Sequence, residues 1–219
     1  MQTIFNSTIV DRIANCGLVA VLIMDRVEDA VPCAKALLEG GVDVMELTLR
    51  TDAALGALEA IRRDVPDMLA GVGTIIFPEQ VQQAQDAGAA FGVSPGLQRG
   101  VMDEAMRLKF PFAPGIMTPS ELELALSYGC RNVKFFPSEP LGGLSYLKSI
   151  QAPYAHLGVR FLPLGGLTLV NLPDYMNASY ILAAGGSWIA PRKLIAARDW
   201  TAITKNAADA RKIIRQIRG

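Results

Sequence analysis

The chain has 219 residues, of which 51% are hydrophobic and 19% are charged. This length and composition indicate one globular domain, or two small ones, with an ample core, and they exclude an intrinsically disordered chain. Lysine plus arginine balance aspartate plus glutamate at 21 each. Net charge therefore gives no reason to expect a nucleic-acid partner or an anionic membrane surface.

The three cysteines, Cys16, Cys33 and Cys130, are too far apart for a metal-binding knuckle and odd in number. They are expected to be reduced thiols that pack as small buried hydrophobes. We find no secretory leader pattern at the start, and no apolar run reaches the roughly 18 residues of a membrane span. These features predict a soluble, cytoplasmic protein.

In chain order, short apolar runs alternate with longer segments of helical period. An N-terminal helix is predicted over residues 1–15 and a closing helix over 199–217. Strands are predicted at residues 18–23, 44–49, 69–73, 91–93, 112–113, 133–136, 160–164 and 180–184. Helices are predicted between them, at residues 27–39, 53–64, 79–87, 101–108 and 120–128.

Several of these helices carry start and stop signals. Thr118, followed by proline and then Glu121, is a capping box with proline at the first helical position. Gly40, Gly88 and Gly129 stand where helices are expected to end.

Strands that are apolar on both faces and separated by helices indicate a parallel sheet. Eight such units in about 200 residues favour a closed (β/α)₈ TIM barrel of the α/β class, and a doubly wound open sheet is the alternative. The chain has no linker, low-complexity tract or charge block, so residues 1–219 are interpreted as a single domain.

Lys134 lies inside a predicted buried strand, between Val133 and a Phe-Phe-Pro run. Desolvation disfavours an ammonium group, so a lysine in such a place can become an amine nucleophile toward a carbonyl and form a Schiff base. From this segment alone, a lysine whose stem is buried and whose head reaches solvent is an equal alternative.

The second strand carries three polar residues in alternation, Glu46, Thr48 and Arg50, which places them on one face. In a barrel, that face is the interior or the mouth at the carboxyl ends of the strands. A structural ion pair is one interpretation. The other is a site in which Glu46 moves protons for Lys134 and Arg50 binds a substrate carboxylate.

Two glycine pairs follow the last two predicted strands, Gly165-Gly166 and Gly185-Gly186, and Ser187 comes directly after the second. Loops after strands seven and eight commonly bind phosphate in such barrels, because glycine lets backbone amides approach an anion. The pairs therefore predict a phosphorylated substrate. The only histidine, His156, falls in a connection and is expected at the surface, and with no carboxylate cluster we expect no metal.

Together these segments resemble the class I 2-keto-3-deoxy-6-phosphogluconate (KDPG) aldolases, which often also act on 4-hydroxy-2-oxoglutarate (KHG). The similarity runs over about residues 13–213. The motifs that carry it are Glu46-Leu47-Thr48-Leu49-Arg50, Gly73-Thr74, Ser94-Pro95-Gly96-Leu97, Pro114-Gly115-Ile116 with Thr118-Pro119-Ser120-Glu121, Val133-Lys134-Phe135-Phe136-Pro137 and Gly185-Gly186-Ser187-Trp188.

The resemblance implies a role for each matching residue. Lys134 corresponds to the Schiff-base lysine and Glu46 to the proton shuttle. The pyruvyl half of the substrate would be bound by Arg50 and Thr74 through its carboxylate, packed by Phe136 and shaped by Pro95. The phosphate loops correspond to Gly165, Gly166, Gly186 and Ser187. The resemblance also implies a homotrimer that needs no cofactor.

The chain departs from the family pattern at two positions. Leu164 stands where the family usually has a threonine that helps position the aldehyde half, and Ser138 replaces an alanine. An aldolase for the galactonate epimer is therefore an alternative, although Gly186-Ser187-Trp188 favours the gluconate type. A non-catalytic sugar-phosphate-binding barrel and a barrel isomerase or epimerase are alternatives of other classes.

Overall fold

The computed structural model describes Phe5 and residues 7–219. The longer helices are α1 (Ser7–Cys16), α2 (Ala30–Glu39), α3 (Ala53–Asp64), α4 (Pro78–Asp86), α5 (Arg99–Leu108), α6 (Pro119–Ser127), α7 (Gly143–Gln151) and α10 (Trp200–Arg218). Shorter helices are η1 (Val27–Asp29), η2 (Glu139–Leu141), η3 (Ala152–Leu157), α8 (Leu172–Met176) and α9 (Arg192–Ala196).

The strands are β1 (Leu18–Leu22), β2 (Val44–Thr48), β3 (Leu69–Gly73), β4 (Gly92–Val93), β5 (Phe112–Ala113), β6 (Gly115–Ile116), β7 (Asn132–Phe135), β8 (Arg160–Pro163) and β9 (Ala184–Gly186). They form a six-stranded sheet in the order β5-β4-β3-β2-β1-β9 and a three-stranded sheet in the order β6-β7-β8. The ladders that join them are parallel. This is the parallel α/β class that the alternation of elements predicts.

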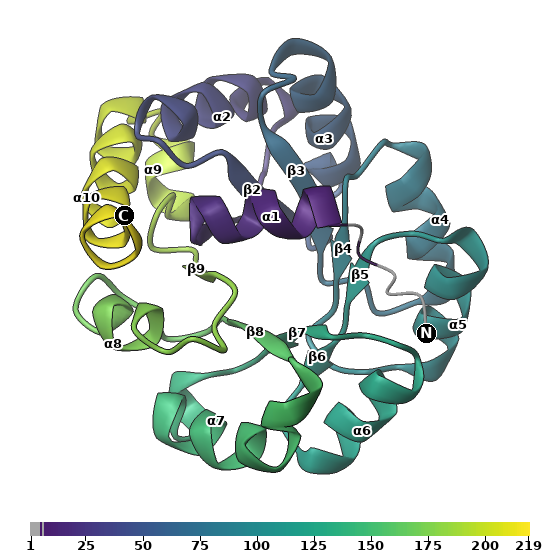
Figure 1. Ribbon diagram of the computed structural model, residues 1–219. Coiled ribbons are helices and arrows are strands. Elements are labelled where there is room, and N and C mark those ends of the chain that lie inside the picture. The colour runs from purple at the N-terminus through teal and green to yellow at the C-terminus, as the bar shows by residue number, and fades with distance from the viewer. Residues whose placement is uncertain (1–4, 6) are drawn as a thin grey trace.

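Pro114 separates the two sheets, because it lies between β5, which pairs with β4, and β6, which pairs with β7. Proline has no N–H to continue a ladder, but its carbonyl accepts a hydrogen bond of 2.9 Å from the amide of Lys134. On the other side of the molecule, the Leu182 amide donates to Phe161 of β8 over 2.8 Å. The sheet is therefore strongly curled, and Figure 1 shows the helices arranged in a ring around the strands.

Helix α1 crosses the middle of this ring (Figure 1). Its apolar side chains Val10, Ile13 and Cys16 are buried. The guanidinium of Arg12 pairs with Asp43 at 3.1 Å and also donates to the carbonyl of Asp67. Since Asp43 and Asp67 come just before β2 and β3, α1 covers the amino ends of the strands and leaves the carboxyl ends free.

Helix α10 packs against α2 and α8. A Cβ atom on Gly40 would lie 2.4 Å from the Cβ of Ala207 and 2.6 Å from the carbonyl of Thr204. Only glycine lets α10 approach the end of α2 this closely. The buried residues of α10 recur with helical spacing, as expected for one apolar stripe: Ile203, Ala207, Ala210 and Ile214.

The predicted helix signals are confirmed in the structure. The amide of Glu121 donates to the Thr118 hydroxyl, and the Thr118 amide donates to the Glu121 carboxylate at 2.8 Å. Gly40 is the C-cap residue of α2. Gly88 and Gly129 follow α4 and α6, and both have a positive φ.

The eighth predicted strand is misplaced. The structure has β9 at Ala184–Gly186, and residues 180–183 contribute only an isolated bridge from Ile181 to Phe161. The glycine pair expected in a loop is thus part of the strand, because Gly185 pairs with Val19, whose carbonyl oxygen would lie 2.3 Å from any Cβ at position 185. The N-terminal helix begins at Ser7, and the part of its prediction that falls on residues 1–4 and 6 lies outside the described residues.

The three cysteines are buried and free, as predicted. Desolvation raises the pKa of Cys16 to about 11 and those of Cys33 and Cys130 to about 12, which keeps these thiols protonated near neutral pH. Among the described helices, none is both long enough and apolar enough to cross a membrane.

Candidate active site

Lys134 is the third residue of β7, and its side chain is only 7% exposed. Its Nζ lies 3.1 Å from Oε1 of Glu46, a residue 88 positions away on β2. Nζ also lies 5.4 Å from the centre of the Phe136 ring. The fold therefore buries the two polar residues that the sequence singled out and brings them into contact.

The Glu46 carboxylate is enclosed as well, with 1% of its side chain exposed. Its second oxygen, Oε2, is buried without a hydrogen-bond partner among the described residues. A buried acceptor without a partner is costly, so this oxygen is available to accept a proton or a hydrogen bond from a bound molecule.

Gly73, at the end of β3, makes room for this carboxylate. A Cβ at position 73 would lie 2.5 Å from Glu46 Oε1. Gly73 belongs to a motif of the sequence, but no local pattern reveals this contact, since it depends on the register between β2 and β3.

Thr48 and Arg50 lie further along the same chain segment. The Thr48 hydroxyl donates to the carbonyl of Leu22 at 2.9 Å and accepts from Nε of Arg50 at 3.3 Å. In the described part of the chain, no ion pair involves Arg50. Its exposed guanidinium therefore remains free to bind a carboxylate.

Thr74 has a φ of 62°, in the left-handed region that a β-branched residue rarely adopts. Strain of this kind tends to gather at functional sites. The conformation places Thr74 in the same cavity wall as Pro95 and Phe136, the two other residues predicted around the pyruvyl half.

The glycine pair after β8 also has left-handed backbone, with φ of 93° at Gly165 and 87° at Gly166. A Cβ on Gly165 would lie 3.1 Å from the Phe136 ring, and one on Gly166 would lie 2.5 Å from Cβ of Glu139. The left-handed backbone and the short contacts both favour glycine at these two positions. They also show that the loop packs closely against the segment that follows β7, the strand that carries Lys134.

A hydrogen-bond network that includes the buried residues Ser138 and Tyr175 supports this loop. The Ser138 amide donates to the carbonyl of Leu164 at 2.8 Å, and the Glu139 amide donates to that of Gly165 at 3.0 Å. The Tyr175 hydroxyl lies 2.7 Å from the Ser138 hydroxyl and also donates to the Glu139 carboxylate. Burial and the Glu139 carboxylate raise the pKa of Tyr175, so it stays a neutral donor.

One cavity of about 510 Å³ is lined by all ten predicted site residues, namely Glu46, Arg50, Thr74, Pro95, Lys134, Phe136, Gly165, Gly166, Gly186 and Ser187. Its volume is in the usual range for a small-molecule site. It lies at the carboxyl ends of the strands, the end where a parallel barrel places its chemistry.

The wall also contains residues that are not among the ten predicted site residues, although Thr48, Leu164 and Trp188 stand out in the sequence. The additional residues are Val21, Leu167, Thr168 and Trp188, together with Thr48 and Leu164. The indole Nε1 of Trp188 is buried and has no hydrogen-bond partner among the described residues, and it would lie 3.0 Å from a Cβ on Gly186. The sequence offers a local indication that Trp188 belongs to the site, because Trp188 directly follows the Gly-Gly-Ser run.

No group of His, Cys, Asp and Glu side chains within the described ranges is arranged to hold a metal ion. His156 lies in η3 and is exposed, as the sequence predicts. The polar groups of the cavity are instead a paired amine and carboxylate, a free guanidinium, hydroxyls and glycine amides. This set suits imine chemistry on an anionic carbonyl compound.

Comparison with known proteins agrees with this chemistry. Residues 9–206 match the family model for KDPG and KHG aldolase. A KHG/KDPG aldolase of Escherichia coli (strain K12) is 42% identical over 193 residues, which are 88% of this chain and 90% of the relative.

Two solved structures are also similar. The KDPG aldolase of Legionella pneumophila, with pyruvate captured as a covalent carbinolamine intermediate, has a TM-score of 0.87 and 36% identity over 92% of this chain and 97% of that chain. The 2-keto-3-deoxy-6-phosphogluconate aldolase of Zymomonas mobilis ZM4, with 3-phosphoglycerate, has a TM-score of 0.85 and 38% identity over 92% and 94%. The family match and the identity across most of both chains establish that this chain belongs to the KDPG/KHG aldolase family.

Proposed function

We propose that the protein is a class I Schiff-base aldolase that cleaves KDPG reversibly to pyruvate and D-glyceraldehyde 3-phosphate. Its reaction class is that of a carbon–carbon lyase. The observation that carries the proposal is the buried contact of 3.1 Å between the Lys134 amine and the Glu46 carboxylate inside the cavity.

The reaction begins when the neutral amine of Lys134 attacks the C2 ketone of the substrate. Glu46 transfers protons as the resulting carbinolamine loses water, and an iminium forms between Nζ and C2. The carboxylate is near enough to take up the amine proton, because its Oε1 already accepts a hydrogen bond from Nζ.

In the second stage, Glu46 takes the proton from the C4 hydroxyl, directly or through a water molecule. The C3–C4 bond breaks, its electron pair moves into the iminium to form an enamine, and C4 leaves as the aldehyde carbon. Protonation of the enamine at C3 and hydrolysis of the imine then release pyruvate and restore the amine.

The remaining wall residues orient the two ends of the substrate. Arg50 and Thr74 bind the C1 carboxylate, while Phe136 and Pro95 pack on the pyruvyl half. Holding that carboxylate keeps the scissile bond aligned with the imine system. Gly165, Gly166, Gly186 and Ser187 bind the phosphate with backbone amides and a hydroxyl, and the left-handed glycines of the first loop support this assignment.

We also propose cleavage of KHG to pyruvate and glyoxylate as a second activity. The pyruvyl half of KHG is the same, so Lys134, Glu46 and Arg50 act unchanged. Leu164, which is 4% exposed and lines the cavity beside the glycine pair, presents an apolar wall to the aldehyde half. A leucine at this position has no hydroxyl with which to distinguish one aldehyde half from another, which favours a dual substrate range and keeps the galactonate epimer as the alternative substrate.

We infer that the two sheets are parts of one closed eight-stranded barrel within a single domain of residues 1–219. In this interpretation β5 and β6 are one strand interrupted at Pro114, and residues 180–186 form the last strand. The bridge between Phe161 and Ile181 supports closure on one side, and the pairing of β9 with β1 supports it on the other.

A cytoplasmic homotrimer is the proposed assembly, by analogy with the family. Sedimentation velocity tests the trimer directly, and a monomer with full activity would contradict it.

Borohydride reduction in the presence of pyruvate, followed by peptide mass spectrometry, tests the function. A reduced pyruvyl adduct is expected on the peptide that contains Lys134, with none when pyruvate is omitted. The variant Lys148→Ala, which removes an exposed lysine of α7, is the control and should be labelled like the wild type. No adduct on a folded protein would reject the aldolase and favour a sugar-phosphate-binding barrel.

A further inference from the structure

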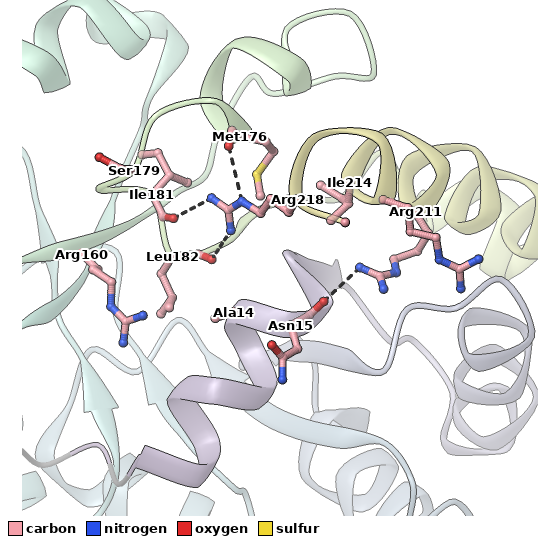
Figure 2. Close-up of a pocket in the computed structure, with 12 residues that line it drawn as sticks. Ala14, Asn15, Arg160, Met176, Ser179, Ile181, Leu182, Arg211, Ile214 and Arg218 are labelled. Carbon is pink, nitrogen blue, oxygen red and sulfur yellow. Dashed lines mark hydrogen bonds between the residues drawn. The ribbon is translucent and has the colours of Figure 1, made fainter.

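Figure 2 shows a second cavity, of about 620 Å³. Its walls come from α1, the first residue of β8, the last residue of α8, the segment before β9, and the last turns of α10. Arg160 opens β8 and Pro163 ends it, so the cavity lies at the amino ends of the strands. It shares no lining residue with the cavity around Lys134.

Four arginines line this cavity: Arg160, Arg211, Arg215 and Arg218. No aspartate or glutamate is among the described residues that line it. Throughout the part of the chain that the structure describes, none of the four arginines takes part in an ion pair. The cavity therefore concentrates positive charge in a protein whose net charge is zero.

Two of these guanidiniums are held in place by backbone carbonyls. Arg218 donates to Ile181 at 2.7 Å, to Leu182 at 2.9 Å and to Met176 at 3.4 Å. Arg211 donates to Asn15 at 3.2 Å and to Cys16, and its buried Nε has no partner in the described part of the chain. Since a guanidinium has five N–H groups, both side chains keep donors to spare in a fixed orientation.

The other two guanidiniums have no such anchor. No hydrogen bond of the Arg160 or Arg215 side chain is found within the described ranges, and in Figure 2 no dashed line joins the Arg160 guanidinium to the other residues drawn. Partial burial and the nearby charge of Arg160 both lower the pKa of the Arg218 guanidinium. This mutual repulsion would be relieved by an anion between the two.

Apolar side chains complete the wall, namely Met176, Ile181, Leu182 and Ile214. Such surroundings lower the local dielectric constant, so a charge–charge contact here is stronger than one in open solvent. The same cavity remains accessible, because Arg215 and Arg218 are exposed and Arg160 is half-buried.

We propose that this arginine cavity binds a small oxyanion with at least two negative charges, such as a phosphate ester or a polycarboxylate. Guanidinium forks bind phosphate and carboxylate oxygens in pairs. Arg218 and Arg211 provide preset donors, while Arg160 and Arg215 close on the ligand. The site is independent of the aldolase reaction and offers a place for a metabolite to bind at the end of the fold that carries no chemistry.

Isothermal titration calorimetry at low ionic strength tests the proposal, with inorganic phosphate and citrate as separate probes. The wild type is compared with the double variant Arg160→Gln/Arg215→Gln, which breaks no hydrogen bond of the described structure. The control Lys148→Gln/Lys212→Gln removes the same charge from exposed positions on α7 and α10 that do not line the cavity.

The wild type and the control should bind at least one of the two probes at this site. The double variant should bind it at least about tenfold more weakly, because a charge-assisted hydrogen bond contributes about a factor of ten or more. The probe with the greater loss identifies the group that the site prefers. The double variant should keep the wild-type rate of aldol cleavage, which shows that the active site is intact.

Identical isotherms for all three proteins would overturn the proposal. So would a double variant that binds both probes normally but sediments as a smaller species, because the arginines would then serve an interface between copies of the chain.

Discussion

The positively charged side chains at the two ends of the strands differ in their burial and in their acidic partners. At the carboxyl ends, Lys134 is nearly buried and contacts a buried carboxylate at 3.1 Å. At the amino ends, Arg160 and Arg215 line an open cavity whose described wall contains no aspartate or glutamate. A cation that is enclosed beside an acid can exchange a proton and act as a nucleophile, whereas one that is open and unpaired can only attract an anion. The roles proposed for the two ends, catalysis and anion binding, follow from this difference in surroundings.

The supports of the two ends differ as well. The carboxyl end depends on close approaches that only glycine permits, such as Gly73 under the Glu46 carboxylate. The amino end is closed by α1, which is attached through the partly exposed pair of Arg12 and Asp43. Substitutions at the first end should therefore affect turnover, and those at the second should affect mainly stability.

Lys134→Ala should have the largest effect, since it removes the nucleophile. Cleavage of KDPG should fall by at least about four orders of magnitude, as expected when a covalent catalyst is lost. The melting temperature should fall because Glu46 loses its partner, while the circular-dichroism spectrum stays native. Cleavage at the wild-type rate would eliminate the proposed role of Lys134.

Glu46→Gln should come next, because it keeps the shape of the side chain and removes its ability to carry a proton. A loss of about 10² to 10⁴ in kcat is expected for a general acid–base group. Steady-state kinetics with KDPG measures it. A change of less than about tenfold would reduce Glu46 to a residue that only shapes the pocket.

Gly73→Ala tests whether the carboxylate must sit where it does. The new Cβ would lie 2.5 Å from Oε1 of Glu46 and displace it. A displacement of this order costs up to about a hundredfold in rate. Gly96→Ala is the matched control, because its Cβ would meet nothing within 4 Å. Equal kcat values for the two variants would mean that the placement of Glu46 is not critical.

Arg12→Gln should have the smallest effect. It tests whether a substitution at the amino ends of the strands changes stability without changing turnover. The side chains of Arg12 and Asp43 are 35% and 37% exposed, and exposed pairs contribute at most about 1 kcal/mol. A fall in the melting temperature of no more than about 4 °C is expected, with kcat unchanged. Loss of turnover at a retained fold would show that the two ends are coupled.

Much of the fold follows from local patterns. The capping box at Thr118 and Glu121 and the left-handed glycines after α4 and α6 lie where predicted, because such signals act within one turn of chain. The last strand did not follow its pattern. Residues 180–184 are apolar, but Gly185 and Gly186 pair with β1, where the backbone of Val19 comes too close for a side chain.

By itself, the sequence determined the alternation of strands and helices and the polar residues at the strand ends, since periodicity and turn chemistry depend on near neighbours. Only the tertiary structure decided that Lys134 meets Glu46 across 88 positions, and that Arg160 joins three arginines of α10. Such contacts depend on the register and curl of the sheet and on where the closing helix packs. Those features arise from the summed packing of the whole chain, and no short segment encodes them.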